Sequence, residues 1–171
     1  MQILFLPAGW TIALCVIGWF LFQLAAALIC MIIPRRLLSP ERGLFREREW
    51  EQGGRVYKRL FRVNRWKHLL PDGAAVTKGG YRKKRLTDFS RENLDRFLLE
   101  SCRAELTHLL AILPFWVFGF IGPPRMIVYM LLYAMAVNLP CIVVQRYNRP
   151  RVRSLLDRIE YRARDSSIAY E

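Results

Sequence analysis

Three long apolar runs divide the chain. Residues 11–33 contain no ionisable side chain, and Gln23 is their one strongly polar residue. Two further apolar runs cover residues 106–122 and 126–144, and only the turn-forming sequence Gly-Pro-Pro-Arg separates them. Because a helix needs about 20 apolar residues to cross a bilayer, we predict three transmembrane helices. The first is expected at about residues 10–33, and the last two should form an antiparallel hairpin.

Basic residues are distributed unevenly around these runs. Of the 27 Lys and Arg residues, 19 lie between the first and second runs and seven follow the third. The positive-inside rule therefore predicts that residues 34–105 and the tail 145–171 are cytoplasmic and that the N-terminus lies outside. No basic residue precedes the first run, which is also too long for a signal-peptide core, so we expect it to be retained. The prediction is a multi-pass protein of the cell membrane with a single membrane domain, residues 1–171.

The cytoplasmic segment shows its own helical pattern. From Arg55 to Trp66, apolar and basic residues share a helical repeat, which suits a helix lying flat on the inner leaflet or one packed on its own protein. A second helix is expected to begin near Asp88 and Ser90 as caps and to continue into the second apolar run, with nothing to interrupt it before Pro114. The predicted fold class is an all-α integral membrane protein with three transmembrane helices and an interfacial, basic helical cytoplasmic segment between the first and second.

Composition removes several other functions. The net charge of +13 could attract nucleic acid, but the membrane topology and anionic lipid headgroups account for it, so we expect no nucleic-acid partner. Four scattered cysteines and two histidines have no metal-site spacing, so no metal and no bound cofactor are expected. About 70 cytoplasmic residues form little core of their own, which disfavours a soluble catalytic domain.

The entrance to the second run carries an ionisable pair. Glu105 and His108 are three residues apart and share a helical face. Such a pair at a bilayer entrance marks a candidate functional site, although a snorkelling pair at headgroup level is the structural alternative. The sequences "QRYNRPR" and "RWKHLLPDG" are expected near the same rim. With Arg103 they complete the candidate set, which adds Lys67, His68, Asp72, Arg146, Asn148 and Arg149.

Three motifs carry a resemblance to a known family. "RWKHLLPDG", "ESCRAELTHLLAILP" and "VQRYNRPR", in this order after an apolar N-terminal helix, resemble the glycosyl-4,4'-diaponeurosporenoate acyltransferases of bacterial carotenoid synthesis. The similarity spans most of residues 10–155. It implies a membrane-bound enzyme that transfers a fatty acyl group to a sugar hydroxyl of a glycosylated C30 carotenoid acid or similar glycolipid, the last step towards staphyloxanthin-like pigments.

The candidate residues suit this chemistry. A base must take the proton of the attacking hydroxyl, and an imidazole held by a carboxylate is a common solution. His108 is the predicted base and Glu105 its orienting partner, with Asp72 and Lys67 also assigned to the catalytic group. The expected substrate-binding residues are Arg103, Arg146, Asn148, Arg149 and His68, where arginine would hold an oxyanion or donor phosphates. His68 is also the rival base, and a solvated surface histidine is its structural alternative.

The expected partners are the bilayer, the glycosylated carotenoid or glycolipid acceptor, and acyl-CoA or another acyl-thioester as donor. Association with other enzymes of the pathway is a further expectation. A non-catalytic membrane adaptor or anionic-lipid-binding scaffold with basic cytoplasmic loops is the alternative function, and it predicts that Glu105 and His108 are dispensable.

Overall fold

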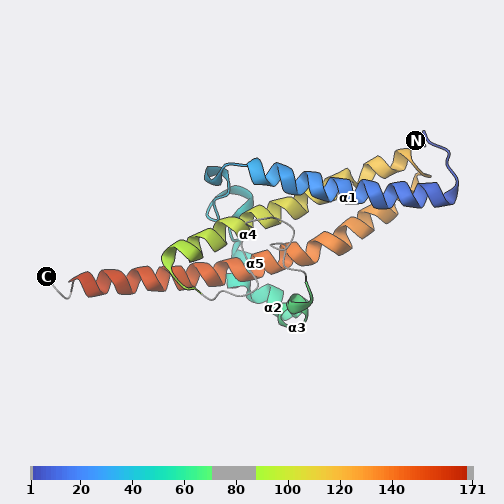
Figure 1. The fold of residues 1–171 in the computed structure, drawn as a ribbon. Helices are drawn as coiled ribbons and strands as arrows, with labels where there is room; N and C mark the ends of the chain where they lie inside the picture. The colour runs from blue at the N-terminus through green and yellow to red at the C-terminus, as the bar shows by residue number, and fades with distance from the viewer. Residues whose placement is uncertain (1, 71–87, 169–171) are drawn as a thin grey trace. The chain divides into compact units, whose positions relative to one another are not determined.

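A computed structural model describes residues 2–70 and 88–168, and all regular secondary structure in these ranges is helical (Figure 1). This confirms the predicted all-α class. The chain divides into two compact units: unit 1 comprises Met1–Pro34 and Arg103–Ile142, and unit 2 comprises Arg35–Cys102 and Val143–Glu171. The elements in chain order are α1 (Ala8–Ile32), η1 (Arg35–Leu37), η2 (Gly43–Phe45), η3 (Glu49–Gly54), α2 (Arg55–Phe61), α3 (Val63–Trp66), η4 (Lys67–Leu69), α4 (Arg91–Ile112), η6 (Leu113–Phe120) and α5 (Arg125–Ile168).

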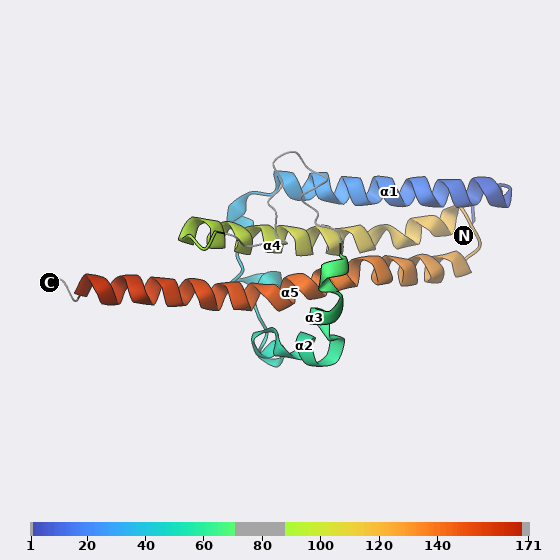
Figure 2. The ribbon, with the colours of Figure 1, turned by 60° about the horizontal axis from the view of Figure 1, so that its bottom comes forward.

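Unit 1 consists of α1, the end of α4 with η6, and the start of α5, which run side by side (Figures 1 and 2). Its core is aromatic: the ring of Trp19 lies 5.8 Å from that of Phe118 and 5.1 Å from that of Tyr133. Cys15 and Ala134 complete the buried cluster. Because Trp19 contacts both η6 and α5, α1 is packed as an integral part of this unit.

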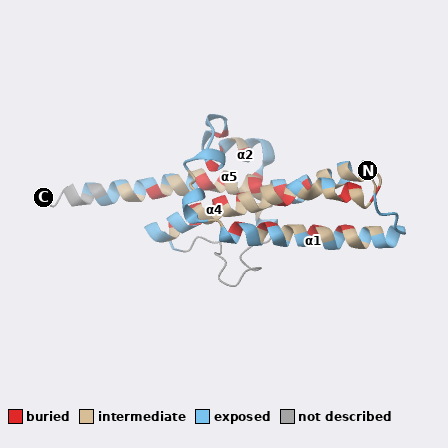
Figure 3. Cartoon of the chain, turned by 90° about the horizontal axis from the view of Figure 1, so that it is seen from above, coloured by how far each residue is buried: buried red, intermediate tan, exposed pale blue. Residues whose placement is uncertain are grey.

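Two of the three predicted spans coincide with helices long and apolar enough to cross a membrane, α1 and α5. Only 17% of the apolar window of each helix is buried, and many large apolar residues of both helices are exposed. Figure 3 colours the exposed positions pale blue. A core helix of a soluble protein would bury most of such a window. These two helices are therefore not explained by packing inside the described structure.

The second predicted span, residues 106–122, has a different structure. The α-helix α4 ends at Ile112, and the 3₁₀ segment η6 follows with Pro114 near its start. Proline has no backbone N–H to donate to an α-helical hydrogen bond, so Pro114 accounts for the end of the α-helix here. The expected single span is thus divided, and the described residues contain two clear candidate spans instead of three.

The start of α4 follows the sequence signals. The Asp88 carboxylate accepts hydrogen bonds from the backbone N–H and the hydroxyl of Ser90, both at 2.8 Å, and the helix begins at Arg91. Further along, Leu94 and Leu98 pack against Leu156 of α5 inside unit 2. This packing stabilises the part of α4 that precedes the apolar run.

The basic segment is not one helix. Arg62 adopts a left-handed conformation, with φ of 48°, and separates α2 from α3. The prediction of continuous helix from Arg55 to Trp66 was therefore wrong at this residue, since nothing in an arginine favours that conformation. The buried side chains Tyr57 and Val63 pack with Tyr147 of α5, which continues unbroken through the predicted tail to Ile168.

Candidate functional site

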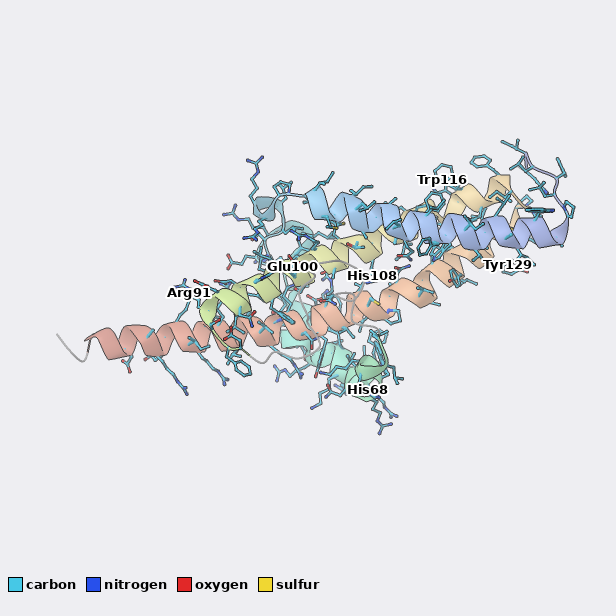
Figure 4. The ribbon with its side chains drawn as sticks, in the orientation of Figure 1. His68, Arg91, Glu100, His108, Trp116 and Tyr129 are labelled. Carbon is cyan, nitrogen blue, oxygen red and sulfur yellow. The ribbon has the colours of Figure 1, made fainter. Side chains whose placement is uncertain are left out.

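Unit 1 contains a polar cluster, centred on one buried residue, that joins α1, α4 and α5. Asn138 on α5 is fully buried, and its Oδ1 lies 2.9 Å from His108 Nδ1 on α4 and 3.3 Å from Gln23 Nε2 on α1. Its amide nitrogen donates to the Ala134 carbonyl at 2.9 Å. His108 lies on the α4 ribbon in Figure 4. The cluster gives the predicted base a defined partner from another helix.

Glu105 lies one turn before His108 on the same face of α4. Its side chain is buried, with 1% of the residue exposed, whereas Arg103 and His108 are half-buried. Burial of a carboxylate in an apolar unit supports its selection as a candidate residue. The orienting contact between Glu105 and His108 stays a prediction.

Unit 2 contains a second polar site, formed around Arg146 of α5. The guanidinium contacts Glu51 at 2.9 Å and donates to the Leu44 carbonyl at 2.7 Å. Glu51 also accepts a 2.6 Å hydrogen bond from the Arg48 backbone N–H and one from the Tyr57 hydroxyl. The ion pair is therefore enclosed by backbone and side-chain partners.

This environment shifts the pKa values of two ionisable neighbours of Arg146, Glu51 and Tyr57. Burial by itself would raise the pKa of Glu51, but the hydrogen bonds from Tyr57, Arg48 and Arg146 outweigh it and hold the pKa below its usual value. Burial, followed by the nearby Glu51 carboxylate, raises the pKa of Tyr57. Glu51 is thus held as a carboxylate and Tyr57 as a neutral phenol.

Arg149 is buried one turn further along α5, with 5% of the residue exposed. Its Nε donates to Ser101 Oγ at 2.9 Å, and its terminal nitrogens donate to the carbonyls of Phe45 at 3.0 Å and Ser101 at 3.2 Å. The guanidinium also lies over the Phe45 ring, 5.7 Å from its centroid. A single arginine therefore connects α4, η2 and α5 within unit 2.

A cavity of about 290 Å³ opens between these groups. Four arginines and three glutamates line it together with Phe45 and two prolines. The charged lining residues are Arg46, Arg146, Arg149, Arg153, Glu41, Glu47 and Glu51. The lining therefore carries one more guanidinium group than carboxylate groups, and two of its arginines, Arg146 and Arg153, form ion pairs with Glu51 and Glu41.

The remaining candidates in unit 2 have different surroundings. Lys67 Nζ lies 5.2 Å from the centroid of the Tyr147 ring, and the Tyr147 hydroxyl donates to Asn64 Oδ1 at 2.6 Å. His68 is exposed, as its structural alternative predicted (Figure 4), while Asn148 is half-buried on α5. Asp72 lies outside the described residues.

The sequence predicted that Lys67 and the "QRYNRPR" motif lie close together. In the structure Lys67 lies over the ring of Tyr147, a residue of that motif. Sequence reasoning did not select Asn138 or Gln23, although both are polar residues inside apolar runs, which is the signal that could have identified them. Glu51 and Ser101 had no such signal, because the arginines that they contact, Arg146 and Arg149, lie 95 and 48 positions away in the sequence. Among residues 2–70 and 88–168, no group of three His, Cys, Asp or Glu side chains could hold a metal ion.

Comparison with known proteins identifies relatives over most of the chain. Residues 41–158 match a family model described as glycosyl-4,4'-diaponeurosporenoate acyltransferase. A protein with this name from Staphylococcus aureus (strain bovine RF122 / ET3-1) is 34% identical over 143 residues, which cover 83% of this chain and 86% of the relative. A second one, from Staphylococcus haemolyticus (strain JCSC1435), is 35% identical over 135 residues, 78% of each chain. No solved structure matches this chain.

Proposed function

Since the chain belongs to the glycosyl-4,4'-diaponeurosporenoate acyltransferase family and is an acyltransferase, we propose that it transfers a fatty acyl group to a sugar hydroxyl of a glycosylated C30 carotenoid acid or similar glycolipid. The observation that carries this proposal is His108, an imidazole held by a buried amide in the apolar unit 1. The non-catalytic adaptor is not retained, because the family consists of enzymes.

The proposed reaction is a direct transfer. His108 takes the proton of the sugar hydroxyl while the hydroxyl oxygen attacks the carbonyl carbon of an acyl-thioester, such as acyl-CoA. The tetrahedral intermediate then collapses, the carbon–sulfur bond breaks, and the imidazolium returns the proton to the departing thiolate. The products are the acylated glycoside and a free thiol. In this proposal Glu105 stabilises the imidazolium.

The arginine-lined cavity of unit 2 supports a donor-binding role. A guanidinium group binds phosphate through two parallel hydrogen bonds, and coenzyme A carries several phosphates. Arg149 and Arg146 line this cavity, with Lys67 close to the neighbouring Tyr147. We assign these residues to the anionic part of the donor, with Arg103, Asn148, His68 and Asp72 retained as further candidate residues around the substrates.

We further propose that the protein is a multi-pass protein of the cell membrane with its N-terminus outside and its C-terminus cytoplasmic. The exposed apolar faces of α1 and α5 support membrane insertion, and the distribution of basic residues supports the orientation. Reporter fusions at Gly122 and Glu171 test it: we expect an outside signal at Gly122 and a cytoplasmic one at Glu171. A cytoplasmic signal at Gly122 would contradict the topology.

The function is tested by expressing the chain in cells that make a glycosylated C30 carotenoid acid and measuring the ratio of acylated to unacylated glycoside in extracted lipids. His108→Ala should reduce this ratio by about 10²- to 10⁴-fold, the usual contribution of general-base catalysis, when normalised to membrane-inserted protein. Glu105→Gln should reduce it less. If the wild-type chain yields no acylated glycoside, the acceptor is wrong; if His108→Ala retains product and His68→Ala loses it, His68 is the base.

A further inference from the structure

Asn138 is the polar centre of unit 1. It is fully buried on α5 and forms hydrogen bonds with side chains of two other segments, Gln23 of α1 and His108 of α4. A polar side chain inside an apolar helix is unfavourable unless it is hydrogen-bonded, and such residues commonly mark functional sites. Asn138 is therefore a candidate for a role beyond packing.

The neighbours of Asn138 determine which way its amide faces. Nδ2 lies 2.9 Å from the Ala134 carbonyl oxygen, which can only accept a hydrogen bond. The reversed amide would place its own oxygen against that carbonyl, leaving two acceptors face to face. The amide must consequently present Oδ1, an acceptor, to Gln23 and His108.

This orientation determines the tautomer of His108. An acceptor 2.9 Å from Nδ1 requires that Nδ1 carries the proton. In the neutral imidazole the lone pair is then on Nε2, and only a nitrogen with a lone pair can act as a base. Asn138 thereby determines which ring nitrogen of His108 is basic: Nδ1 faces Asn138 and is protonated, and Nε2 carries the lone pair.

We propose that Asn138 is the positioning residue of the acyl transfer: it fixes the Nδ1-protonated tautomer of His108, and Gln23 holds the Asn138 amide in place. This inference rests on the proposed function, because it presupposes His108 as the base. A neutral amide can accept the hydrogen bond from Nδ1–H without adding a charge. An ionised carboxylate in the same position would add one.

The first test is spectroscopic and independent of activity. Protein labelled with ¹⁵N-histidine is reconstituted in lipid nanodiscs, and the nitrogen shifts report which ring nitrogen carries the proton. The chain has two histidines, so the spectrum of His108→Ala identifies the signals of His68. We expect wild-type His108 and Asn138→Asp to be protonated at Nδ1, and Asn138→Leu to lose this preference.

The second test measures turnover of the same proteins with acyl-CoA and the glycosylated carotenoid acid. Asn138→Leu should lower kcat at least about ten-fold with KM within about two-fold, because proton transfer and not binding is affected. Asn138→Asp also accepts from Nδ1–H, and in its protonated form its hydroxyl can donate to the Ala134 carbonyl as Nδ2 does, so it should recover most of kcat. A merely structural role predicts the opposite order, since leucine suits an apolar helix better than aspartate.

Distinct results would overturn the proposal. It fails if Asn138→Leu keeps the wild-type tautomer or the wild-type kcat while His108→Ala is inactive, and the proposed function then survives. If His108→Ala is itself active, the assigned base and its positioning residue both fail. Should Asn138→Leu not insert, Asn138→Asp decides alone: an inserted, inactive variant that keeps the Nδ1-protonated tautomer would contradict the inference.

Discussion

Two buried polar residues, Asn138 of unit 1 and Arg149 of unit 2, are held by different kinds of partner. In unit 1 the described contacts of Asn138 are with the Gln23 amide, the His108 imidazole and a backbone carbonyl. In unit 2 the buried Arg149 is charged, and it donates to the carbonyls of Phe45 and Ser101 and to the Ser101 hydroxyl. The comparison shows two ways to bury a polar side chain: an amide avoids the desolvation of an ion, whereas a buried guanidinium needs several hydrogen bonds around it.

The comparison predicts the largest loss of stability at Arg149. Arg149→Met leaves the Phe45 and Ser101 carbonyls without this donor, so we expect the free energy of unfolding to fall by about 3–5 kcal/mol. The measurement is thermal or denaturant unfolding in detergent. Arg153→Met is the matched control, because its ion pair with Glu41 at 2.5 Å is exposed and should contribute less than about 1 kcal/mol. Equal losses for the two variants would contradict the distinction between buried and exposed arginines.

A second prediction concerns the glycine pair at the start of α2. Gly54 has a φ of 79°, and a Cβ there would lie 2.8 Å from the Tyr147 carbonyl oxygen. Gly54→Ala should destabilise by about 2–4 kcal/mol, from the left-handed conformation and the clash together. Gly53→Ala is the control, since Gly53 has a φ of 68° but no atom within 4 Å of the added Cβ. It should cost about 1–2 kcal/mol, and the difference in melting temperature between the variants isolates the close approach to α5.

The charged site of unit 2 should also be sensitive to pH. The pKa of Glu51 is lower in the folded protein, so its stabilisation is present above the unfolded pKa of about 4.3 and is lost as the pH falls through the folded pKa. Glu51→Gln should lower stability by about 1–2 kcal/mol at pH 7 and flatten the decline in acid. Melting temperatures between pH 7 and 3.5 measure this. Parallel curves for wild type and Glu51→Gln would exclude Glu51 as the titrating group.

The smallest effect is expected in unit 1. Gln23→Leu removes one hydrogen bond to Asn138. Hydrogen bonds between membrane-spanning helices, which we propose α1 and α5 to be, contribute only about 0.6 kcal/mol on average. Unfolding in detergent should therefore differ from wild type by less than about 1 kcal/mol. A loss comparable with that of Arg149→Met would show that the neutral network stabilises its unit as strongly as the charged one does.

Much of the fold could be predicted from local patterns. The apolar run at 11–33 became α1, and Asp88 with Ser90 preceded the start of α4. The break at Arg62 could not be predicted, because its left-handed conformation depends on tertiary packing. The change from α to 3₁₀ helix near Pro114 divides the span that the continuous apolar run at 106–122 had predicted.

The candidate site was predictable in part. His108 was selected because an ionisable residue in an apolar run is unusual, and the same argument applies to Asn138. Their contact could not be foreseen, because it depends on how two helices are rotated about their axes. The partners of Arg149 were even less accessible, since backbone carbonyls such as that of Phe45 leave no mark in the sequence.

The hydrogen bond between Gln23 and Asn138 cannot form until late in synthesis of the chain. These residues are 115 positions apart. A ribosome that adds about 5–20 residues per second needs roughly 6–23 s to bridge that distance. Through this interval the Gln23 amide of the newly made α1 has no Asn138 to bond with, so any other hydrogen bond that it forms must be exchanged when α5 packs beside α1.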